Sequence, residues 1–340
     1  MKASRTLILL SLFSALVFVI SGVGLLYLPY GGARPDHVKF TVKSGQSNSA
    51  IARNLEKKNL IASSTLFKIA VRLMGKTQAL KSGQYKVEGN ISIIGLIGIL
   101  EKGKEVLISV TIPEGYRMTE IFALLKSKGY QNSGRYMKWA TDKSFIDRLK
   151  IPVKVNMLEG ILFPDTYNFP KGASEKLILK TMVANFKKRI PKDFKVKAQR
   201  AGLSYYQAIT LASIVEKETG RAAERPTISS VFHNRMAIKM KLQTDPTVIY
   251  GIKNYAGRIR SKHLKMPHPY NTYVIRGLPP TPIASPGMMS LMAAVDPKKT
   301  KFLYFVARGD GTHEFTTNFK DHDKAVTKYQ RRRKKDYRSY

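Results

Sequence analysis

Residues 203–220 read Leu-Ser-Tyr-Tyr-Gln-Ala-Ile-Thr-Leu-Ala-Ser-Ile-Val-Glu-Lys-Glu-Thr-Gly and predict a helix that carries the chemistry of the chain. Ser204 followed by Gln207 has the spacing of a capping box, and Gly220 marks a C-terminal stop. Projected at about 100° per residue, the helix has an apolar face formed by Ala208, Leu211, Ala212 and Val215. Its polar back is formed by Thr210, Ser213 and Lys217.

Two glutamates near the end of this helix have different surroundings. Glu218 projects between Leu211 and Ile214, inside the apolar face, and Glu216 falls at its edge. A carboxylate directed into packed apolar surface is desolvated, so its pKa rises and it stays protonated near neutral pH. That is the state a general acid needs. The same pattern equally fits a frayed helix end, at which Glu218 simply reaches water.

Composition bounds the possible classes of protein. The 340 residues can form one large or two modest domains beside an anchor. Because the chain contains no cysteine, it needs no disulfides. Its formal net charge of +36 attracts polyanions, which include nucleic acid, anionic lipid headgroups and acidic cell-wall polymers. Charge alone does not choose among them.

The N-terminal stretch narrows that choice. After Lys2 and Arg5, residues 7–28 are uncharged and dominated by Leu, Val, Ile and Phe, which exceeds the ~20 apolar residues that span a bilayer. The basic residues predict that residues 1–6 are cytoplasmic, that residues 7–29 form a single-pass anchor, and that the rest lies outside. A cleavable signal peptide is the alternative, but no Ala-x-Ala-like site follows. Because the chain after the anchor is expected to lie outside the cytoplasm, nucleic acid is not expected as a partner.

A small subdomain is expected after the anchor. Residues 30–37, with Gly-Gly and Arg-Pro, are typical of a linker. Alternation predicts a strand at 38–43, helical spacing predicts helices at 47–58 and 66–73, and residues 83–87 form a return strand. Their order is strand, helix, helix, strand.

The string Phe40-Thr-Val-Lys-Ser-Gly-Gln-Ser47, followed by Ile51-Ala52, resembles the first half of a LysM module, a small βααβ unit that binds peptidoglycan glycan. The second half lacks the usual Leu-Asn signature. The resemblance implies a LysM-like βααβ subdomain over residues 38–105. Seventy positions after Thr41, Thr111-Ile-Pro-Glu-Gly115 repeats its pattern and predicts a second strand–turn–helix unit, either as a duplication or as an ordinary piece of that kind.

Two later segments add candidates. Residues 157–167 combine Gly, Pro, Asp and aromatics and predict an ordered loop. Within it, Glu159 and Asp165 are possible second carboxylates, although Asp beside Pro more often forms turn hydrogen bonds. Residues 173–189 predict a basic amphipathic helix, a kind that is usually solvated surface.

Residues 242–251, 270–273 and 277–287 are rich in amides, hydroxyls and rings, with few charges. Such groups recognise sugars, because planar amides and carboxylates bond hydroxyls and aromatic faces cover pyranose rings. No metal site is expected, since the six histidines lack ligand spacing and there is no cysteine. A Gly-x-Ser-x-Gly elbow is also missing from the sequence.

Several ordered motifs together resemble the MltG (YceG-like) endolytic murein transglycosylases. They are Leu211-Ala-Ser-Ile-Val-Glu-Lys-Glu-Thr219, Leu242-Gln-Thr-Asp-Pro-Thr-Val-Ile-Tyr-Gly251, Tyr270-Asn-Thr-Tyr273, Gly277-Leu-Pro-Pro280, Leu303-Tyr-Phe-Val306, Leu158-Glu-Gly160 and Phe163-Pro-Asp-Thr-Tyr167. The resemblance implies an α+β protein whose mixed α/β catalytic region, residues 106–330, carries a lysozyme-like catalytic helix. Residues 331–340 form a basic tail outside the resemblance.

The resemblance implies that Glu218, the second glutamate of Glu-Lys-Glu-Thr, is the catalytic residue. The implied reaction is a lyase reaction that breaks the MurNAc–GlcNAc bond inside nascent glycan strands, leaves 1,6-anhydroMurNAc ends and ends strand elongation. Gln243, Asp245, Asn271 and Tyr273 are the candidates for holding the glycan. No cofactor is required. The implied setting is the inner (cytoplasmic) membrane, with the catalytic domain periplasmic and peptidoglycan synthases as partners.

Two other classes of function remain open from the sequence. One is a non-catalytic, peptidoglycan-binding scaffold of the envelope in which Glu218 is structural. The other is a binder of anionic polymers or nucleic acid driven by charge, against which the anchor argues.

Overall fold

The computed structural model describes residues 24–30, 37–43, 45–103, 107–131, 133–253 and 255–331. The chain divides into two compact units. The first comprises residues 1–108 with 168–171, and the second comprises residues 109–167 with 172–340. The predicted anchor falls on residues 7–29, of which 7–23 lie outside the described residues, as do most of the linker and residues 332–340 of the tail. Every helix within the described ranges is too short or too polar to cross a bilayer.

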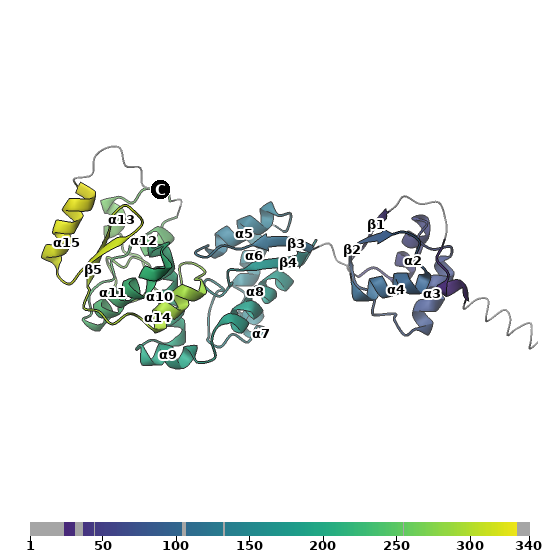
Figure 1. Ribbon diagram of the computed structural model, residues 1–340, viewed down its shortest axis with the longest axis horizontal. Helices are drawn as coiled ribbons and strands as arrows, with labels where there is room; N and C mark the ends of the chain where they lie inside the picture. Colours follow the sequence, from purple (N-terminus) through teal and green to yellow (C-terminus); the bar gives the residue numbers. More distant parts are fainter. Residues whose placement is uncertain are drawn as a thin grey trace, which may run out of the picture. The chain divides into compact units, whose positions relative to one another are not determined.

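The first unit has the predicted strand, helix, helix, strand order, followed by one further helix (Figure 1). Its elements are β1 (His37–Val42), α2 (Asn48–Lys57), α3 (Ser64–Leu73), β2 (Gly83–Glu88) and α4 (Ile93–Lys102). The two strands pair antiparallel, with Phe40 opposite Tyr85. The four predicted elements are therefore confirmed to within two residues at every end.

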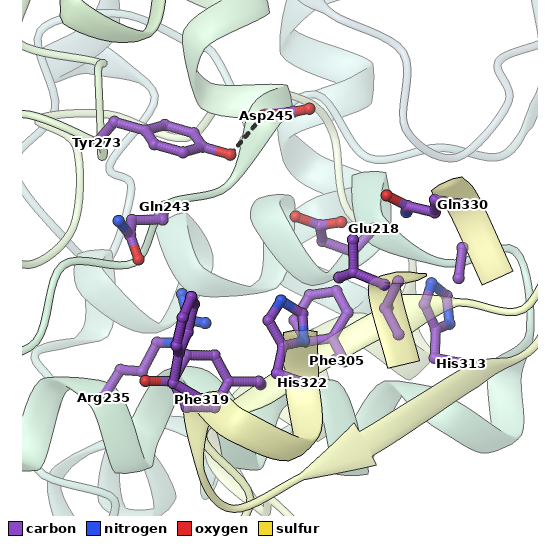
Figure 2. A pocket seen from close by; sticks show the side chains of 14 residues that line it. Glu218, Arg235, Gln243, Asp245, Tyr273, Phe305, His313, Phe319, His322 and Gln330 are labelled. Atoms are coloured by element: carbon purple, nitrogen blue, oxygen red, sulfur yellow. Dashed lines mark hydrogen bonds between the residues drawn. The ribbon is translucent and has the colours of Figure 1, made fainter. Parts of the chain in front are cut away.

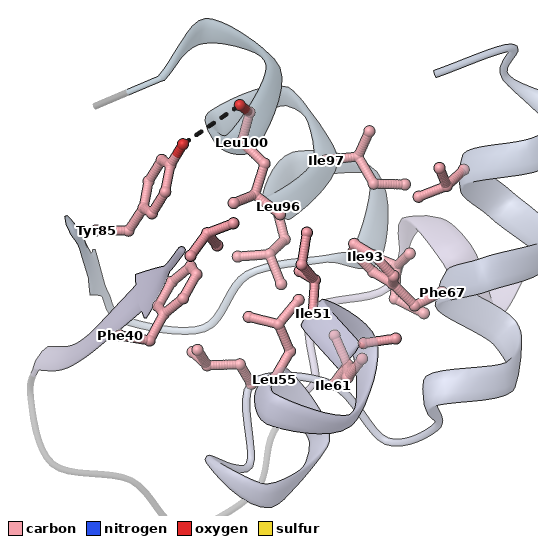
Figure 3. Close-up of a cluster of buried hydrophobic side chains, with 14 of the residues drawn as sticks. Phe40, Ile51, Leu55, Ile61, Phe67, Tyr85, Ile93, Leu96, Ile97 and Leu100 are labelled. Atoms are coloured by element: carbon pink, nitrogen blue, oxygen red, sulfur yellow. Dashed lines mark hydrogen bonds between the residues drawn. The ribbon is translucent and has the colours of Figure 1, made fainter. Parts of the chain in front are cut away.

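An apolar core holds the described part of this unit together (Figure 3). Phe40 and Tyr85 stack with ring centroids 5.2 Å apart on the inner face of the strands. Leu55 from α2 and Leu96 from α4 are completely buried in the same cluster. Each helix begins at a serine whose hydroxyl accepts a backbone N–H three residues on, which satisfies one free donor of the first turn.

Within the described residues, the first half of the second unit contains a short two-stranded sheet and four helices. Its elements are β3 (Leu107–Thr111), α5 (Met118–Ser127), α6 (Ser133–Ala140), α7 (Lys143–Arg148), β4 (Thr166–Pro170) and α8 (Glu175–Arg189). β3 pairs with β4, and residues 107–108 of β3 and 168–170 of β4 belong to the first unit. The strand–turn–helix expected around Thr111 is confirmed. The loop predicted over 157–167 is also found, except that its last two residues begin β4.

The second half is a helical assembly around α10. Its elements are α9 (Phe194–Arg200), α10 (Tyr205–Glu218), η1 (Ala222–Glu224), α11 (Arg225–Ala237), α12 (Asp245–Gly251), α13 (Ser261–Lys265), α14 (Met288–Val295), β5 (Tyr304–Ala307), β6 (His313–Thr316), α15 (Phe319–Val326) and η2 (Thr327–Arg331). Helix α10 contacts α9, α11, α12 and α14. The antiparallel hairpin β5–β6 and α15 lie together beside α11 (Figure 1).

The surroundings of α10 correct two details of the sequence prediction. Thr210 and Ser213, predicted on a polar back, are buried, because α10 is covered on all sides along its middle. Their hydroxyls are satisfied within the fold: Ser213 donates to the carbonyl of Thr210 and accepts the N–H of Ile283. The helix ends at Glu218 through an extended Thr219, so Gly220 does not form a left-handed cap.

Candidate active site

Glu218 is the last residue of α10, at the point where the chain leaves the helix. The predicted capping box fixes the other end of the helix: Gln207 accepts the N–H of Ser204, and Ser204 accepts the N–H of Gln207. The half-buried carboxyl of Glu218 faces a cavity of about 500 Å³ (Figure 2). The cavity is lined by Glu218, Arg235, Gln243, Asp245, Tyr273, Tyr304, Phe305, Val306, Ala307, His313, Phe319, His322, Val326 and Gln330.

The hydroxyl of Thr244 donates a hydrogen bond to the carboxyl of Glu218. Thr244 is itself held in place, because its N–H donates to the hydroxyl of Thr272 over 3.0 Å and its carbonyl accepts the hydroxyl of Thr247 over 2.7 Å. All three threonines are buried. The carboxyl group therefore has one fixed donor on its protein side while its other side opens to the cavity.

Burial, with a smaller contribution from the nearby charge of Asp245, raises the pKa of Glu218 to about 7, against the hydrogen bond from Thr244 and the charge of Arg235. This is the direction and the cause that the helical projection predicted. At neutral pH a substantial fraction of Glu218 carries a proton, as general acid catalysis requires.

Three of the four predicted sugar-binding residues line the same cavity (Figure 2). Asp245 is the first residue of α12, and its carboxylate accepts the hydroxyl of Tyr273 over 2.7 Å. Gln243 has a φ of 48°, a left-handed conformation that is uncommon outside glycine. Such positions cluster at functional sites.

The fourth predicted residue, Asn271, does not line the cavity. Its side chain is buried, and its amide donates to the carbonyls of His263, Leu264 and Met266. Its carbonyl oxygen accepts the N–H of Tyr273 over 3.0 Å. Asn271 thus fixes the turn that presents Tyr273.

The far wall of the cavity comes from β5 and from the C-terminal segment that includes α15. The ring of His322 stacks on Tyr304, with centroids 5.0 Å apart and an interplanar angle of 24°. Phe319 keeps 65% of its surface exposed at this wall. The guanidinium of Arg235 donates to the carbonyls of Leu303 and Leu242 over 2.6 Å, which ties the wall to the segment carrying Gln243.

Comparison with known proteins shows which family this chain belongs to. A model of the YceG-like family matches residues 40–328. The chain belongs to the YceG-like family. It is 35% identical over 306 residues to an endolytic murein transglycosylase of Bacillus subtilis (strain 168), with 86% of this chain and 84% of the relative covered. The resemblance drawn from the sequence motifs is therefore confirmed.

Two further relatives extend the comparison. An endolytic murein transglycosylase of Streptococcus pneumoniae serotype 2 is 27% identical, and the match covers 89% of this chain but 60% of that protein's length. The crystal structure of a putative YceG-like protein from Listeria monocytogenes superimposes with a TM-score of 0.57 at 30% identity, covering 85% of this chain and 98% of the other. The mixed α+β architecture is thus that of a YceG-like fold.

Glu216 of this YceG-like chain lies on a different side of α10. Its carboxylate accepts the guanidinium of Arg225 over 2.8 Å and the N–H of Gly287 over 2.8 Å, and both charged side chains are nearly fully buried. Arg225 also lies 3.5 Å from Glu114. Glu216 does not line the cavity of Glu218.

The two other candidate carboxylates also lie apart from the cavity. Glu159 is 2% exposed and accepts the N–H of Met118 and the hydroxyl of Tyr250, and burial raises its pKa to about 7. Asp165 accepts Asn185 and Arg189, and these donors lower its pKa. Among the described residues, no group of three His, Cys, Asp or Glu could hold a metal ion.

Sequence reasoning did not single out Thr244, Arg235 or the far wall of the cavity. Thr244 falls inside the quoted segment 242–251, so attention to hydroxyls beside Asp245 would have found it. The motif Leu303-Tyr-Phe-Val306 contains three of the wall residues, but no pattern in the sequence indicated that they face Glu218. Arg235 and the residues of α15 gave no local signal, because the fold brings α11, β5 and α15 together at this cavity.

Proposed function

We propose that this YceG-like chain is an endolytic peptidoglycan lytic transglycosylase in which Glu218 is both acid and base. One observation carries the assignment: a half-buried carboxyl with a pKa near 7 faces a large cavity lined by amide, phenol, carboxylate and aromatic groups. The names of the relatives support the substrate, since the two curated proteins compared above are endolytic murein transglycosylases.

In the first step, the protonated carboxyl of Glu218 gives its proton to the oxygen that links MurNAc to GlcNAc, and the bond from that oxygen to C1 of MurNAc breaks. In the second step, the C6 hydroxyl of the same MurNAc attacks C1 and its proton passes to the carboxylate of Glu218. The carboxyl is thereby regenerated, no water is consumed, and the product ends in a 1,6-anhydro ring. Cleavage inside a nascent strand ends its elongation.

A single enzyme carboxyl is sufficient for this route, because the nucleophile belongs to the substrate. This differs from the two-carboxylate arrangement of most glycoside hydrolases. The second acid in the cavity, Asp245, has another role: it accepts the hydroxyl of Tyr273, and its charge raises the pKa of Glu218. The substrate's own N-acetyl oxygen stabilises the oxocarbenium-like transition state.

Gln243, Asp245 and Tyr273 hold the sugar hydroxyls from one side of the cavity. From the other side, the exposed ring of Phe319 covers the apolar face of a pyranose ring, as aromatic side chains in carbohydrate sites do. Asn271, proposed from the sequence as a fourth glycan ligand, acts through the turn that it fixes.

We also propose how the chain is placed in the cell. Residues 7–29 anchor it in the inner membrane, with residues 1–6 cytoplasmic, residues 30–37 as linker and the catalytic region 106–330 in the periplasm. The basic residues before a long apolar run support this orientation. The order β1, α2, α3, β2 supports a LysM-like subdomain over residues 38–105. Peptidoglycan synthases, which supply nascent strands, are the expected partners.

Product analysis tests the proposed reaction. The full chain is incubated with purified glycan strands, and the new ends are identified by mass spectrometry. A lyase leaves anhydroMurNAc ends, which are lighter by one water than the reducing ends left by a hydrolase. Reducing ends would overturn the lyase mechanism, and intact strands would favour the alternative, a non-catalytic scaffold that binds peptidoglycan.

A further inference from the structure

A second cavity, of about 450 Å³, lies between α7 and α8, away from the residues of the candidate active site. It is lined by Phe145, Arg148, Leu149, Lys150, Lys176, Leu177, Lys180, Val183, Ala184 and Lys187, which we call the α7–α8 groove. The groove includes part of the basic amphipathic helix predicted over residues 173–189, which the proposed reaction does not use.

The charged lining of the groove is entirely cationic. It holds five basic side chains, namely Arg148, Lys150, Lys176, Lys180 and Lys187, and no acidic one. Within the part of the chain that the structure describes, none of the five forms an ion pair. Cations gathered without counter-charges repel one another, so an anion that enters the groove relieves that repulsion.

The floor of the groove is apolar. Phe145, Leu149 and Val183 are buried beneath it, whereas Leu177 remains 44% exposed. A solvated basic helix face does not need such a floor. An extended hydrophilic polyanion, such as a polyol phosphate, would use the cations but would gain nothing from the exposed carbons of Leu177.

Cations around an apolar floor match an anionic amphiphile. The phosphate of a membrane lipid would contact the lysines and Arg148, and the first part of its acyl chain would cover the apolar floor. We propose that the α7–α8 groove binds the headgroup of an anionic phospholipid. This contact would hold the second unit at the bilayer surface independently of the N-terminal anchor, and it does not depend on the proposed chemistry.

The chain carries its own reporter for this contact. Trp139 on α6 is the single tryptophan of the sequence. Its ring lies 3.8 Å from the ammonium of Lys176 and has its centroid 5.9 Å from that of Phe145, and both of these residues line the groove. A brominated acyl chain seated on the floor would therefore quench Trp139 fluorescence at short range.

The experiment mixes the full chain with phosphatidylcholine vesicles that contain phosphatidylglycerol, with bromine on the acyl chains of one lipid or the other. We expect brominated phosphatidylglycerol to quench Trp139 several-fold more than brominated phosphatidylcholine at equal bromine content. In the double variant Arg148→Gln/Lys180→Gln, the phosphatidylglycerol fraction needed for half-maximal quenching should rise roughly tenfold, since each basic residue at an anionic surface contributes to binding.

A matched control distinguishes lipid binding in the groove from nonspecific attraction of the basic chain to anionic vesicles. Arg258→Gln/Lys262→Gln also removes one arginine and one lysine, both exposed and outside the groove, and should keep wild-type quenching. Both double variants should keep the melting temperature and the turnover of soluble glycan fragments. Equal loss in the two variants, or equal quenching by the two brominated lipids, would overturn the proposal. Abolition of quenching by millimolar free glycerol phosphate would overturn it too, because the apolar floor would then add nothing.

Discussion

The two sides of the last turn of α10 hold glutamates two residues apart in opposite chemical situations. On one side, the carboxylate of Glu216 is matched by the guanidinium of Arg225 and the N–H of Gly287, so both of its oxygens have partners within the fold. On the other side, Glu218 receives one hydroxyl from Thr244 and faces an open cavity, with its pKa raised to about 7. The partners that the fold supplies, and not the residue type, separate a paired acid from the acid that we propose to be catalytic.

A third carboxyl shows that a raised pKa is not enough. Burial also raises the pKa of Glu159 to about 7, but its two oxygens are occupied by Met118 and Tyr250 and it lines none of the cavity. Strongly shifted groups occur in structural networks as well as in active sites. Access to a cavity that can hold substrate is what distinguishes Glu218 from Glu159.

The largest expected effect comes from Glu218→Gln. The amide keeps the shape of the side chain but cannot deliver a proton, so turnover of glycan strands should fall by about 10²–10⁴. The free energy of unfolding at neutral pH should not decrease, because a half-buried carboxyl with a raised pKa is replaced by a neutral group. A variant that unfolds, or one that keeps wild-type turnover, would contradict the claim that Glu218 serves catalysis while Glu216 serves stability.

Glu216→Gln should have the reverse effects: it should lower the stability of the fold and leave turnover largely intact. It leaves the guanidinium of Arg225 nearly buried beside a neutral amide, and removing one partner of a buried pair costs about 3–5 kcal/mol. Urea unfolding should show this loss, while the folded fraction keeps most of its turnover. As a control, Glu216→Met/Arg225→Met removes both charges and should recover part of the lost stability. No recovery would mean that Arg225 is not the partner that matters.

Glu159→Gln should change how stability depends on pH. The folded state holds the Glu159 proton more tightly than the unfolded chain, since the pKa is raised from 4.5 to about 7. Its contribution is therefore complete below pH 4.5 and is lost as pH rises towards 7, by about 3 kcal/mol in total. The variant should flatten this part of the curve of unfolding free energy against pH and keep wild-type turnover. An unchanged slope would show that Glu159 is not protonated in the fold.

The sequence predicted those parts of the molecule that depend on local pattern. The capping box at Ser204 and the four elements of the first unit follow from caps, alternation and helical spacing, and all are present. The raised pKa of Glu218 followed from its position in the apolar face of α10. The role of Asn271 could not be predicted, because an amide that bonds three backbone carbonyls looks the same in a sequence as one that bonds a sugar.

The pH dependence of turnover tests most directly that Glu218 is the acid. A reaction that needs its proton should lose rate as pH rises through about 7. The hydroxyl of Thr244 lowers the pKa of Glu218, so Thr244→Val should move this falling limb to higher pH, whereas Glu159→Gln should leave it in place. A limb that moves in Glu159→Gln and stays fixed in Thr244→Val would contradict the assignment of Glu218.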